Sequence, residues 1–281
     1  MEIKRIYAPG SEWLYIKIYS GAMVLEKMLL DKVFPLTCSM IDDNLIDKFF
    51  FVRYLDPDYH LRLKFHINDI ENVGKVLFRL RDTFEEDIKN HIIYRYEADT
   101  YVREIERYGA QQIADFETLF FNDSIFIINC LRSFPGYDND RWITCCIVMN
   151  KYFDCLNFSL EERMDFCKTM SEAYNIEFFK DLKDAKIQMG NKYRYKKDLM
   201  FKMLGNEKAN RLTTYTNQIM SFINNVTPEY AKTKLKLIIH MHVNRMFRTQ
   251  QRAIECVIYN LMWKYYISVK AIQSNKENNE Q

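Results

Sequence analysis

The sequence predicts an α+β protein in which a sheet-containing half is followed by a mainly helical half. Apolar residues over the first hundred positions recur in the order β-α-β-β-α-β, which is the order of the split βαβ, ferredoxin-like arrangement. Beyond Gly109 they recur mainly at helical spacing. We therefore expect one domain over residues 1–272, with a sheet-containing half at 1–108, a helical half at 109–272, and a polar, frayed tail at 273–281.

The elements of the first half follow from apolar periodicity and turn residues. A tight turn at Asp56-Pro57-Asp58 joins two alternating runs into a hairpin, and Asn68 is placed to cap the helix that follows them. The expected strands are residues 13–19, 49–55, 59–67 and a stretch near 92–96, and the expected helices are 22–34 and 69–90.

Start signals mark helices in the second half. Ser159 and Glu162 have the spacing of a capping box, and Thr227 followed by Pro228 is typical of a helix start. The loop at residues 133–140 is the clearest break, but it is short enough to be a connection and not a domain linker.

Composition excludes several classes of protein. The 281 residues carry 40 basic and 38 acidic side chains, and this near balance disfavours direct binding of nucleic acid. No stretch approaches the roughly 18 uncharged apolar residues of a membrane span, and the first residues lack the apolar segment of a signal peptide, so we expect a cytoplasmic protein. The seven cysteines form no Cys-x-x-Cys pair and lie in no activating context, which disfavours a zinc site, a disulfide framework and a cysteine nucleophile.

The most informative stretch is the strand at 59–67, because it sorts its side chains by chemistry. Alternate residues of a strand face opposite ways, and one face here is apolar and suited to a core. The other face carries no carboxylate and consists of His60, Arg62, Lys64 and His66. A row of like charges costs stability unless an anion offsets it, so the pattern favours binding of a carboxylate or phosphate. A solvated face of a half-exposed sheet is the alternative.

A second charged stretch lies where the sheet region gives way to helices. On a helix, Arg103 and Arg107 would share a face and repel each other. Glu104 and Glu106 are placed to relieve that repulsion as structural salt bridges, so both arginines are open to a structural as well as a functional interpretation.

The third stretch contains two histidines on a predicted helix. Two positions apart, the side chains diverge by roughly 200° on a helix, which disfavours a shared metal. His242 falls on the apolar stripe and is expected to pack in the core, whereas His240 lies on another face and is the candidate acid or base.

Five landmarks occur in order along nearly the whole chain. They are Trp13 to Tyr19, Phe50 to Tyr54 with Asp56-Pro57 and His60 to Leu63, Tyr101 to Gly109, Phe120 to Ser124, and His240 to Arg245. Together they resemble the C-terminal elimination domain of class I lanthipeptide dehydratases, also called the thiopeptide-type bacteriocin biosynthesis domain. The chain departs from that pattern at Ala110, where a second glycine is usual, and at Lys64, where an arginine is common. A lysine cannot reproduce the bidentate contacts of an arginine with a carboxylate.

The resemblance implies a lyase acting on a ribosomally made precursor peptide. In that family a glutamylation module uses glutamyl-tRNA to esterify Ser or Thr of the peptide, and the elimination domain expels glutamate to leave dehydroalanine or dehydrobutyrine. These 281 residues have no room for the first module. We therefore expect a stand-alone elimination subunit that works with a separate glutamyl-tRNA-dependent glutamylation subunit, and a homo-oligomer is compatible with the sequence.

The resemblance also assigns roles. β-Elimination needs a base for the Cα proton, stabilisation of the enolate and an anion site for glutamate, and it implies no cofactor and no metal. His240 would act as base or as proton donor to the leaving group. Arg62 and Arg103 would hold the glutamyl carboxylates and counter the enolate charge. The expected substrate-binding supports are Lys64, Arg107 and His60.

Two other functions remain open. A relative of the same fold catalyses the formal [4+2] cycloaddition of two dehydroalanines that forms the pyridine core of thiopeptides. Such a cyclase need not expel glutamate and has less reason to keep paired arginines with a histidine. A non-catalytic subunit that binds the precursor peptide is the third hypothesis, and loss of the arginine and histidine positions would have favoured it.

Overall fold

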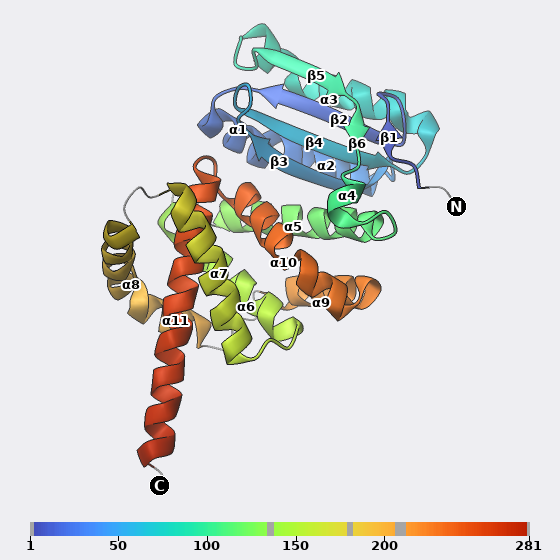
Figure 1. Cartoon of the computed structure of the whole chain (residues 1–281). Coiled ribbons are helices and arrows are strands. Elements are labelled where there is room, and N and C mark those ends of the chain that lie inside the picture. The colour runs from blue at the N-terminus through green and yellow to red at the C-terminus, as the bar shows by residue number, and fades with distance from the viewer. Residues whose placement is uncertain (1–2, 134–137, 179–181, 206–211, 280–281) are drawn as a thin grey trace. The chain divides into compact units, whose positions relative to one another are not determined.

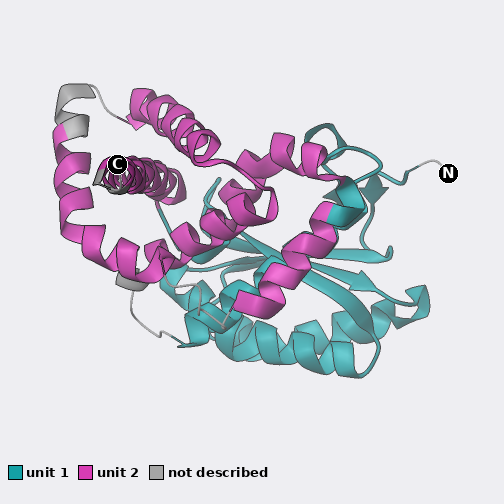
Figure 2. Cartoon of the chain, turned by 90° about the horizontal axis from the view of Figure 1, so that it is seen from below, with its two compact units in different colours: residues 1–135, 224–226, 244–249 teal, residues 136–223, 227–243, 250–281 magenta. Residues whose placement is uncertain are grey.

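The structure is a computed structural model that describes residues 3–133, 138–178, 182–205 and 212–279 (Figure 1). These residues divide into two compact units, shown in different colours in Figure 2. The first unit contains residues 1–135, 224–226 and 244–249, and the second contains residues 136–223, 227–243 and 250–281. The division differs from the expected halves because the long helix after residue 109 belongs with the sheet.

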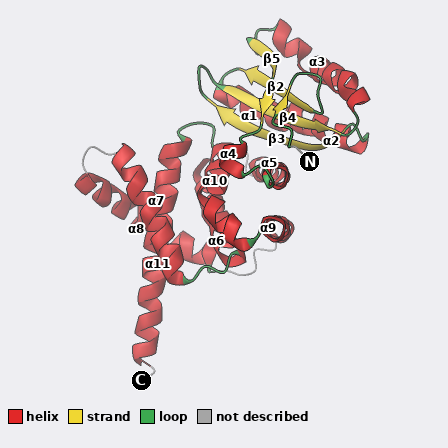
Figure 3. Cartoon of the chain, turned by 45° about the vertical axis from the view of Figure 1, so that its right-hand side comes forward, coloured by secondary structure: helices red, strands yellow, loops and turns green. Residues whose placement is uncertain are grey.

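The first unit contains the strands, drawn in yellow in Figure 3, and the helices around them. Its strands are β1 (Ile6–Tyr7), β2 (Trp13–Tyr19), β3 (Ile46–Tyr54), β4 (His60–Ile67), β5 (Arg95–Asp99) and β6 (Tyr101–Val102). Its helices are α1 (Ala22–Met28), α2 (Phe34–Asp42), α3 (Val73–Lys89), α4 (Ile105–Tyr108) and α5 (Ile113–Ser133).

The four-stranded sheet confirms the split βαβ arrangement. Its order is β3-β4-β2-β5 with every neighbouring pair antiparallel. The β2 and β4 boundaries match the expected strands closely, whereas β5 begins at Arg95 and not near residue 92. A two-stranded ribbon of β1 and β6 was not expected, because two residues are too few to show a period.

Two details of the first half differ from the sequence prediction. The apolar helix expected at 22–34 continues through a π-helical turn at Leu29–Val33 into α2, where Pro35 occupies the first turn. Because the chain is already helical before Pro35, the missing N–H interrupts the hydrogen-bond ladder, and the π-helical turn lies directly before that point. Asp69 caps the 3₁₀ turn Ile70–Asn72 that leads into α3, because its carboxylate accepts from the Glu71 N–H, whereas Asn68 donates its side-chain amide to Asn44.

The predicted apolar face of β4 lies in the core of the first unit. Its side chains are at most 1% exposed and are Leu61, Leu63, Phe65 and Ile67. Helices α1 to α3 cover this face of the sheet (Figure 1). The opposite face therefore carries the polar residues of β4, as the alternation predicts.

The free edge of β3 is closed by side chains. The Asn244 amide donates to the Arg53 carbonyl at 2.9 Å and accepts from the Arg53 N–H at 3.0 Å, so it imitates a paired strand. One step along, Arg245 Nε donates to the Phe51 carbonyl at 2.9 Å, and the Phe51 N–H donates to Ser124 Oγ at 3.3 Å. An edge covered in this way cannot pair with another chain.

Arg245 also forms a buried ion pair. Its Nη1 lies 2.8 Å from Asp123 Oδ2, and the two side chains are 1% and 5% exposed. The guanidinium lies over the Phe120 ring at 4.8 Å. Asn244 and Arg245 therefore hold the sheet, although the sequence places them in the same landmark as His240.

The second unit is helical. Its helices are α6 (Asp138–Cys155), α7 (Leu160–Phe178), α8 (Leu182–Leu204), α9 (Thr213–Val226), α10 (Pro228–Met246) and α11 (Gln251–Asn279), with the ends of α9 and α10 assigned to the first unit. The capping box before α7 is confirmed, because the Glu162 N–H donates to Ser159 Oγ and the Ser159 N–H donates to Glu162 Oε2. The Tyr230 N–H donates to Thr227 Oγ1 at the start of α10, as expected.

Two expectations at the edges of the helical part need comment. Of the loop expected at 133–140, residues 134–137 lie outside the described residues, and helix resumes at Asp138. The tail expected to fray from residue 273 is helical up to Asn279. Among the described helices, none combines the length and the apolar character that crossing a membrane would require.

We predict that Asp123→Ala lowers the free energy of unfolding by about 3 to 5 kcal/mol, because it leaves the Arg245 guanidinium buried without its counter-charge. Urea denaturation measures this change. The matched control is Glu85→Ala, which removes the partner of Lys89 from an ion pair whose side chains are 51% and 70% exposed. That change should stay within about 0.5 kcal/mol of the parent. Equal effects of the two substitutions would contradict the role of the buried pair.

Candidate functional site

Arg62 on β4 is held in place without a carboxylate partner in the described part of the chain. Its Nε donates to His60 Nε2 at 3.0 Å, and its guanidinium lies over the Tyr54 ring at 3.4 Å. A ring face attracts a cation without neutralising it. The two terminal nitrogens of the guanidinium are therefore positioned to receive an anion in the bidentate manner typical of arginine.

His60 lies beside Arg62 and is 1% exposed. Its Nδ1 lies 2.8 Å from the Asp58 carbonyl, which can only accept, so Nδ1 carries the proton and Nε2 accepts from Arg62. The ring stacks on Tyr19 with centroids 4.5 Å apart. Burial lowers the pKa of His60, and the charge of Arg62 lowers it further. The structure thus shows a neutral imidazole that orients Arg62, while its expected contact with substrate stays a prediction.

Lys64 lies two residues beyond Arg62 on the same face of β4. Its ammonium lies among three aromatic rings, 5.0 Å from the centroid of Tyr15, 4.8 Å from Phe50 and 5.1 Å from Tyr101. Among the described residues, no acidic side chain forms an ion pair with it. Burial, followed by repulsion from Arg62, lowers the pKa of Lys64 to about 7.

Arg103, expected to bind substrate, has an internal carboxylate partner. Its Nε lies 2.7 Å from Glu117 Oε1 and its Nη2 lies 2.6 Å from Oε2, which is a bidentate pair with side chains 12% and 3% exposed. The Tyr101 hydroxyl donates to Glu117 Oε1 at 2.8 Å. Arg103 therefore has a structural role, and a catalytic role for it stays a prediction.

Arg107 lies on the surface, and its side chain is 51% exposed. Its Nη1 is 2.8 Å from Glu104 Oε2, which confirms one expected structural salt bridge. The expected helix face shared with Arg103 is wrong, because α4 begins only at Ile105. Glu106 pairs with Arg5 at 2.6 Å instead of with either arginine.

His240 on α10 belongs to the second unit, where it pairs with an acidic residue of α11. Its Nδ1 lies 2.8 Å from Glu255 Oε2, and the two side chains are 31% and 0% exposed. A carboxylate at Nδ1 fixes the ring and leaves Nε2 as the atom for proton transfer. Glu255 also raises the pKa of the buried Tyr259, for which burial itself is the larger cause.

The helical phasing of the two histidines is confirmed by their burial. His242 is 2% exposed and packs in the interior, whereas His240 keeps part of its surface. Glu255 was missed by the sequence analysis, because nothing in a single acidic residue of a long helix marks it as the partner of a histidine 15 positions earlier. Five of the six expected site residues lie in the first unit, and His240 lies in the second.

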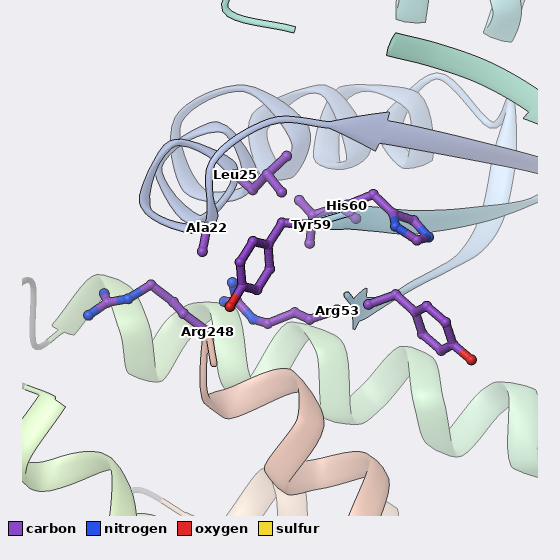
Figure 4. Close-up of a pocket in the computed structure, with 8 residues that line it drawn as sticks. Ala22, Leu25, Arg53, Tyr59, His60 and Arg248 are labelled. Atoms are coloured by element: carbon purple, nitrogen blue, oxygen red, sulfur yellow. The ribbon is translucent and has the colours of Figure 1, made fainter. Parts of the chain in front are cut away.

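A small pocket of the first unit is lined by His60 and by the other residues labelled in Figure 4, which are Ala22, Leu25, Arg53, Tyr59 and Arg248. Tyr54 and Leu61 complete the lining. Both arginines already share one carboxylate, since Glu26 Oε2 is 2.9 Å from Arg53 and Glu26 Oε1 is 2.8 Å from Arg248. Their charges are thus partly balanced, and Arg62 is the better anion ligand. Among the described residues there is no cluster of three His, Cys, Asp or Glu side chains suited to a metal ion.

Residues 13–266 match the family model described as the C-terminal part of lantibiotic biosynthesis dehydratases. The chain belongs to this family. Over 94% of its length it is 27% identical to the nisin biosynthesis protein NisB of Lactococcus lactis subsp. lactis, and over 88% it is 26% identical to the subtilin biosynthesis protein SpaB of Bacillus subtilis. It spans about a quarter of each relative, 26% and 25% of their lengths.

Solved structures share the fold. The tRNA-dependent lantibiotic dehydratase MibB from Microbispora sp. 107891 aligns with a TM-score of 0.66 and 19% identity over 98% of this chain and 29% of MibB. The pyridine synthase TbtD from thiomuracin biosynthesis aligns with a TM-score of 0.69 and 13% identity over 93% of this chain and 100% of TbtD. At these identities the likeness concerns the fold alone.

We predict that the stability of the protein falls as pH drops below about 6.5, in part through His60. Burial and Arg62 hold the folded pKa of His60 below its ordinary value of 6.5, so the unfolded chain takes up the proton first. The contribution of His60 is therefore present above pH 6.5 and is lost as pH falls toward the folded pKa.

Urea denaturation between about pH 5 and 7.5 tests this dependence. His60→Gln should lower stability at neutral pH and flatten its pH dependence. The control His91→Asn, at an exposed position with a φ of 56° that asparagine tolerates, should leave the dependence unchanged. A pH dependence that His60→Gln does not alter would remove His60 as its source.

Proposed function

We propose that this chain eliminates glutamate from glutamylated Ser or Thr of a ribosomal precursor peptide, leaving dehydroalanine or dehydrobutyrine. The observation that carries the proposal is Arg62, whose guanidinium is fixed by His60 and Tyr54 while no carboxylate in the described residues pairs with it. Membership of the lantibiotic dehydratase family supports catalysis of a dehydration step. A charge held ready for an anion is what the departure of glutamate requires.

The chemistry assigns one task to each group. The Cα proton leaves to a base, the electron pair of that C–H bond forms the Cα–Cβ double bond, and the Cβ–O bond breaks to release glutamate as a carboxylate. Arg62 and Lys64 offset the negative charge that develops. His240, held by Glu255, would act through Nε2, either as the base that takes the Cα proton or as a proton donor to the leaving glutamate. Arg103 pairs with Glu117, which accepts from the hydroxyl of Tyr101, and the Tyr101 ring lies against Lys64. Arg103 would therefore position that ring, and Arg107 would be a more distant support.

The proposal leaves glutamylation to another module. The 281 residues correspond to about a quarter of NisB and SpaB, and glutamylation would be carried out outside them by a glutamyl-tRNA-dependent module that acts on the same precursor peptide. Such a reaction sequence takes place where charged tRNA is found, in the cytoplasm. No cofactor or metal enters the elimination step.

Pyridine synthesis is the second candidate. The observation that favours it is the alignment with TbtD, which covers the whole of that chain. A [4+2] cyclisation of two dehydroalanines expels no glutamate. It therefore has less need of an anion site formed by Arg62 and Lys64. We therefore rank elimination first and a non-catalytic peptide-binding role last.

We predict that Arg62→Ala slows release of glutamate from a pre-glutamylated peptide by about 10- to 150-fold, because it removes a charge-assisted contact of roughly 1.5 to 3 kcal/mol. Mass spectrometry follows the loss of the glutamyl group. The control Arg81→Ala removes an exposed arginine that pairs with Asp82 on α3, and it should retain the parental rate.

Two results would overturn this assignment. One is a glutamylated peptide that stays intact with the parent protein, and the other is pyridine formation from a dehydrated peptide. An unmodified precursor should stay unchanged with this protein even when tRNA, glutamate, its synthetase and ATP are present. Adding a cognate glutamylation protein should then produce the loss of one water mass per modified residue.

We predict opposite effects for the two histidines of α10. His240→Ala should slow elimination on the order of a hundredfold with little change in melting temperature, as for a general acid or base. His242→Ala should lower the melting temperature through lost packing. Glu255→Gln should preserve the fold but lower the rate, because an amide no longer balances a protonated imidazole. Single-turnover rates and thermal unfolding of the three variants decide this, and a His242-dependent rate would contradict it.

A further inference from the structure

The position of Lys64 combines three features that no other lysine of the described sheet shares. Its ammonium is enclosed by Tyr15, Phe50 and Tyr101, it shares a strand face with Arg62, and no described carboxylate forms an ion pair with it. Lys17, its neighbour on β2, differs because it pairs with Asp99. Lys48 on β3 lies 3.9 Å from Asp47 Oδ2.

The charged groups that face Lys64 come from several elements of the first unit. Arg62 on its own strand and Arg245 disfavour its protonation, whereas Glu104 before α4 and Glu117 on α5 favour it. Glu117 accepts hydrogen bonds from Arg103 and Tyr101, so Arg103 already balances most of its negative charge. Burial is the largest cause and, with repulsion from Arg62, lowers the pKa of Lys64 to about 7.

We propose that Arg62 and Lys64 bind a carboxylate together, and that binding this carboxylate draws a proton onto Lys64. The inference rests on the proposed function, since the carboxylate would be that of the glutamyl group or the released glutamate. An anion placed against Lys64 favours the ammonium form and raises its pKa. By linkage, the carboxylate then binds most tightly below about pH 7 and loses affinity above it.

The coupling between carboxylate binding and proton uptake depends on position 64 being a lysine and not an arginine. An arginine stays charged at every accessible pH, so a chain with arginine at this position would bind the carboxylate without taking up a proton. A lysine in the same aromatic surroundings titrates instead. A lysine at this position therefore makes carboxylate binding depend on pH, which an arginine would not.

Isothermal titration calorimetry of the 281-residue protein with L-glutamate tests the coupling in buffers of different ionisation enthalpy. For a free pKa of about 7, we expect uptake of about 0.1 proton per glutamate at pH 6 and about 0.9 at pH 8, with Kd rising about tenfold between them. Lys64→Arg should bind with no proton uptake and a Kd that changes little. Lys64→Met should bind weakly at both values. Lys48→Arg is the control and should behave as the parent does.

A second measurement does not depend on a ligand. The 13Cε resonance of Lys64, assigned by its disappearance in Lys64→Arg, should titrate with a midpoint near pH 7 and shift to higher pH when glutamate is added. A midpoint above about 9 in the free protein would overturn the inference.

The outcomes separate this inference from the proposed function. Elimination by the parent protein without linked proton uptake would leave the function standing and remove the coupling. Glutamate-linked proton uptake without elimination would support the carboxylate site and remove the eliminase. Equal proton uptake by Lys64→Arg and the parent would also overturn the role of Lys64. Absence of glutamate binding at both pH values overturns the inference.

Discussion

Arg62 and Lys64 lie two residues apart on one face of β4, and neither forms an ion pair with a carboxylate of the described residues. The structure of the first unit has to stabilise these two neighbouring cations in another way. Aromatic rings supply the solution: Tyr54 lies under Arg62, and three rings surround Lys64. Rings attract cations but leave their charge uncancelled. His60 completes the arrangement, because a neutral imidazole accepts from Arg62 where a carboxylate would have neutralised it. The resulting face keeps positive potential that an anion can use.

Several acidic side chains of the same unit form ion pairs with other cations. Glu117 pairs with Arg103, and Asp123 pairs with Arg245. Glu26 accepts from two arginines at once. Asp99, whose pKa is lowered mainly by its hydrogen bond with Lys17 and less by the charge of Arg62, pairs with Lys17 and not with Arg62. The division of arginines into structural and available ones is therefore a property of the whole unit, and it explains why several conspicuous arginines are poor candidates for substrate binding.

Local pattern predicted much of this fold and little of its pairing. The alternation in β4 and the phasing of His242 required only the period of one element, and both predictions hold. The closure of the β3 edge by Asn244 joins positions that are 191 residues apart, which no local period can report. The same limit hid Glu117 as the partner of Arg103 and Glu255 as the partner of His240. The sequence analysis did not identify these ion-pair partners, because residue type alone does not determine which carboxylate pairs with a given cation.

The chemistry of Lys64 differs from that of an arginine in the same surroundings. An ammonium is a compact, strongly hydrated charge, so enclosure by rings costs it more than it costs a delocalised guanidinium. Repulsion from Arg62 also lowers the pKa of Lys64, and a lysine can lose its proton where an arginine would stay charged. Loss of the proton from Lys64 removes the repulsion between the two cations. A bound carboxylate removes the reason for that loss, and the proton returns with the anion.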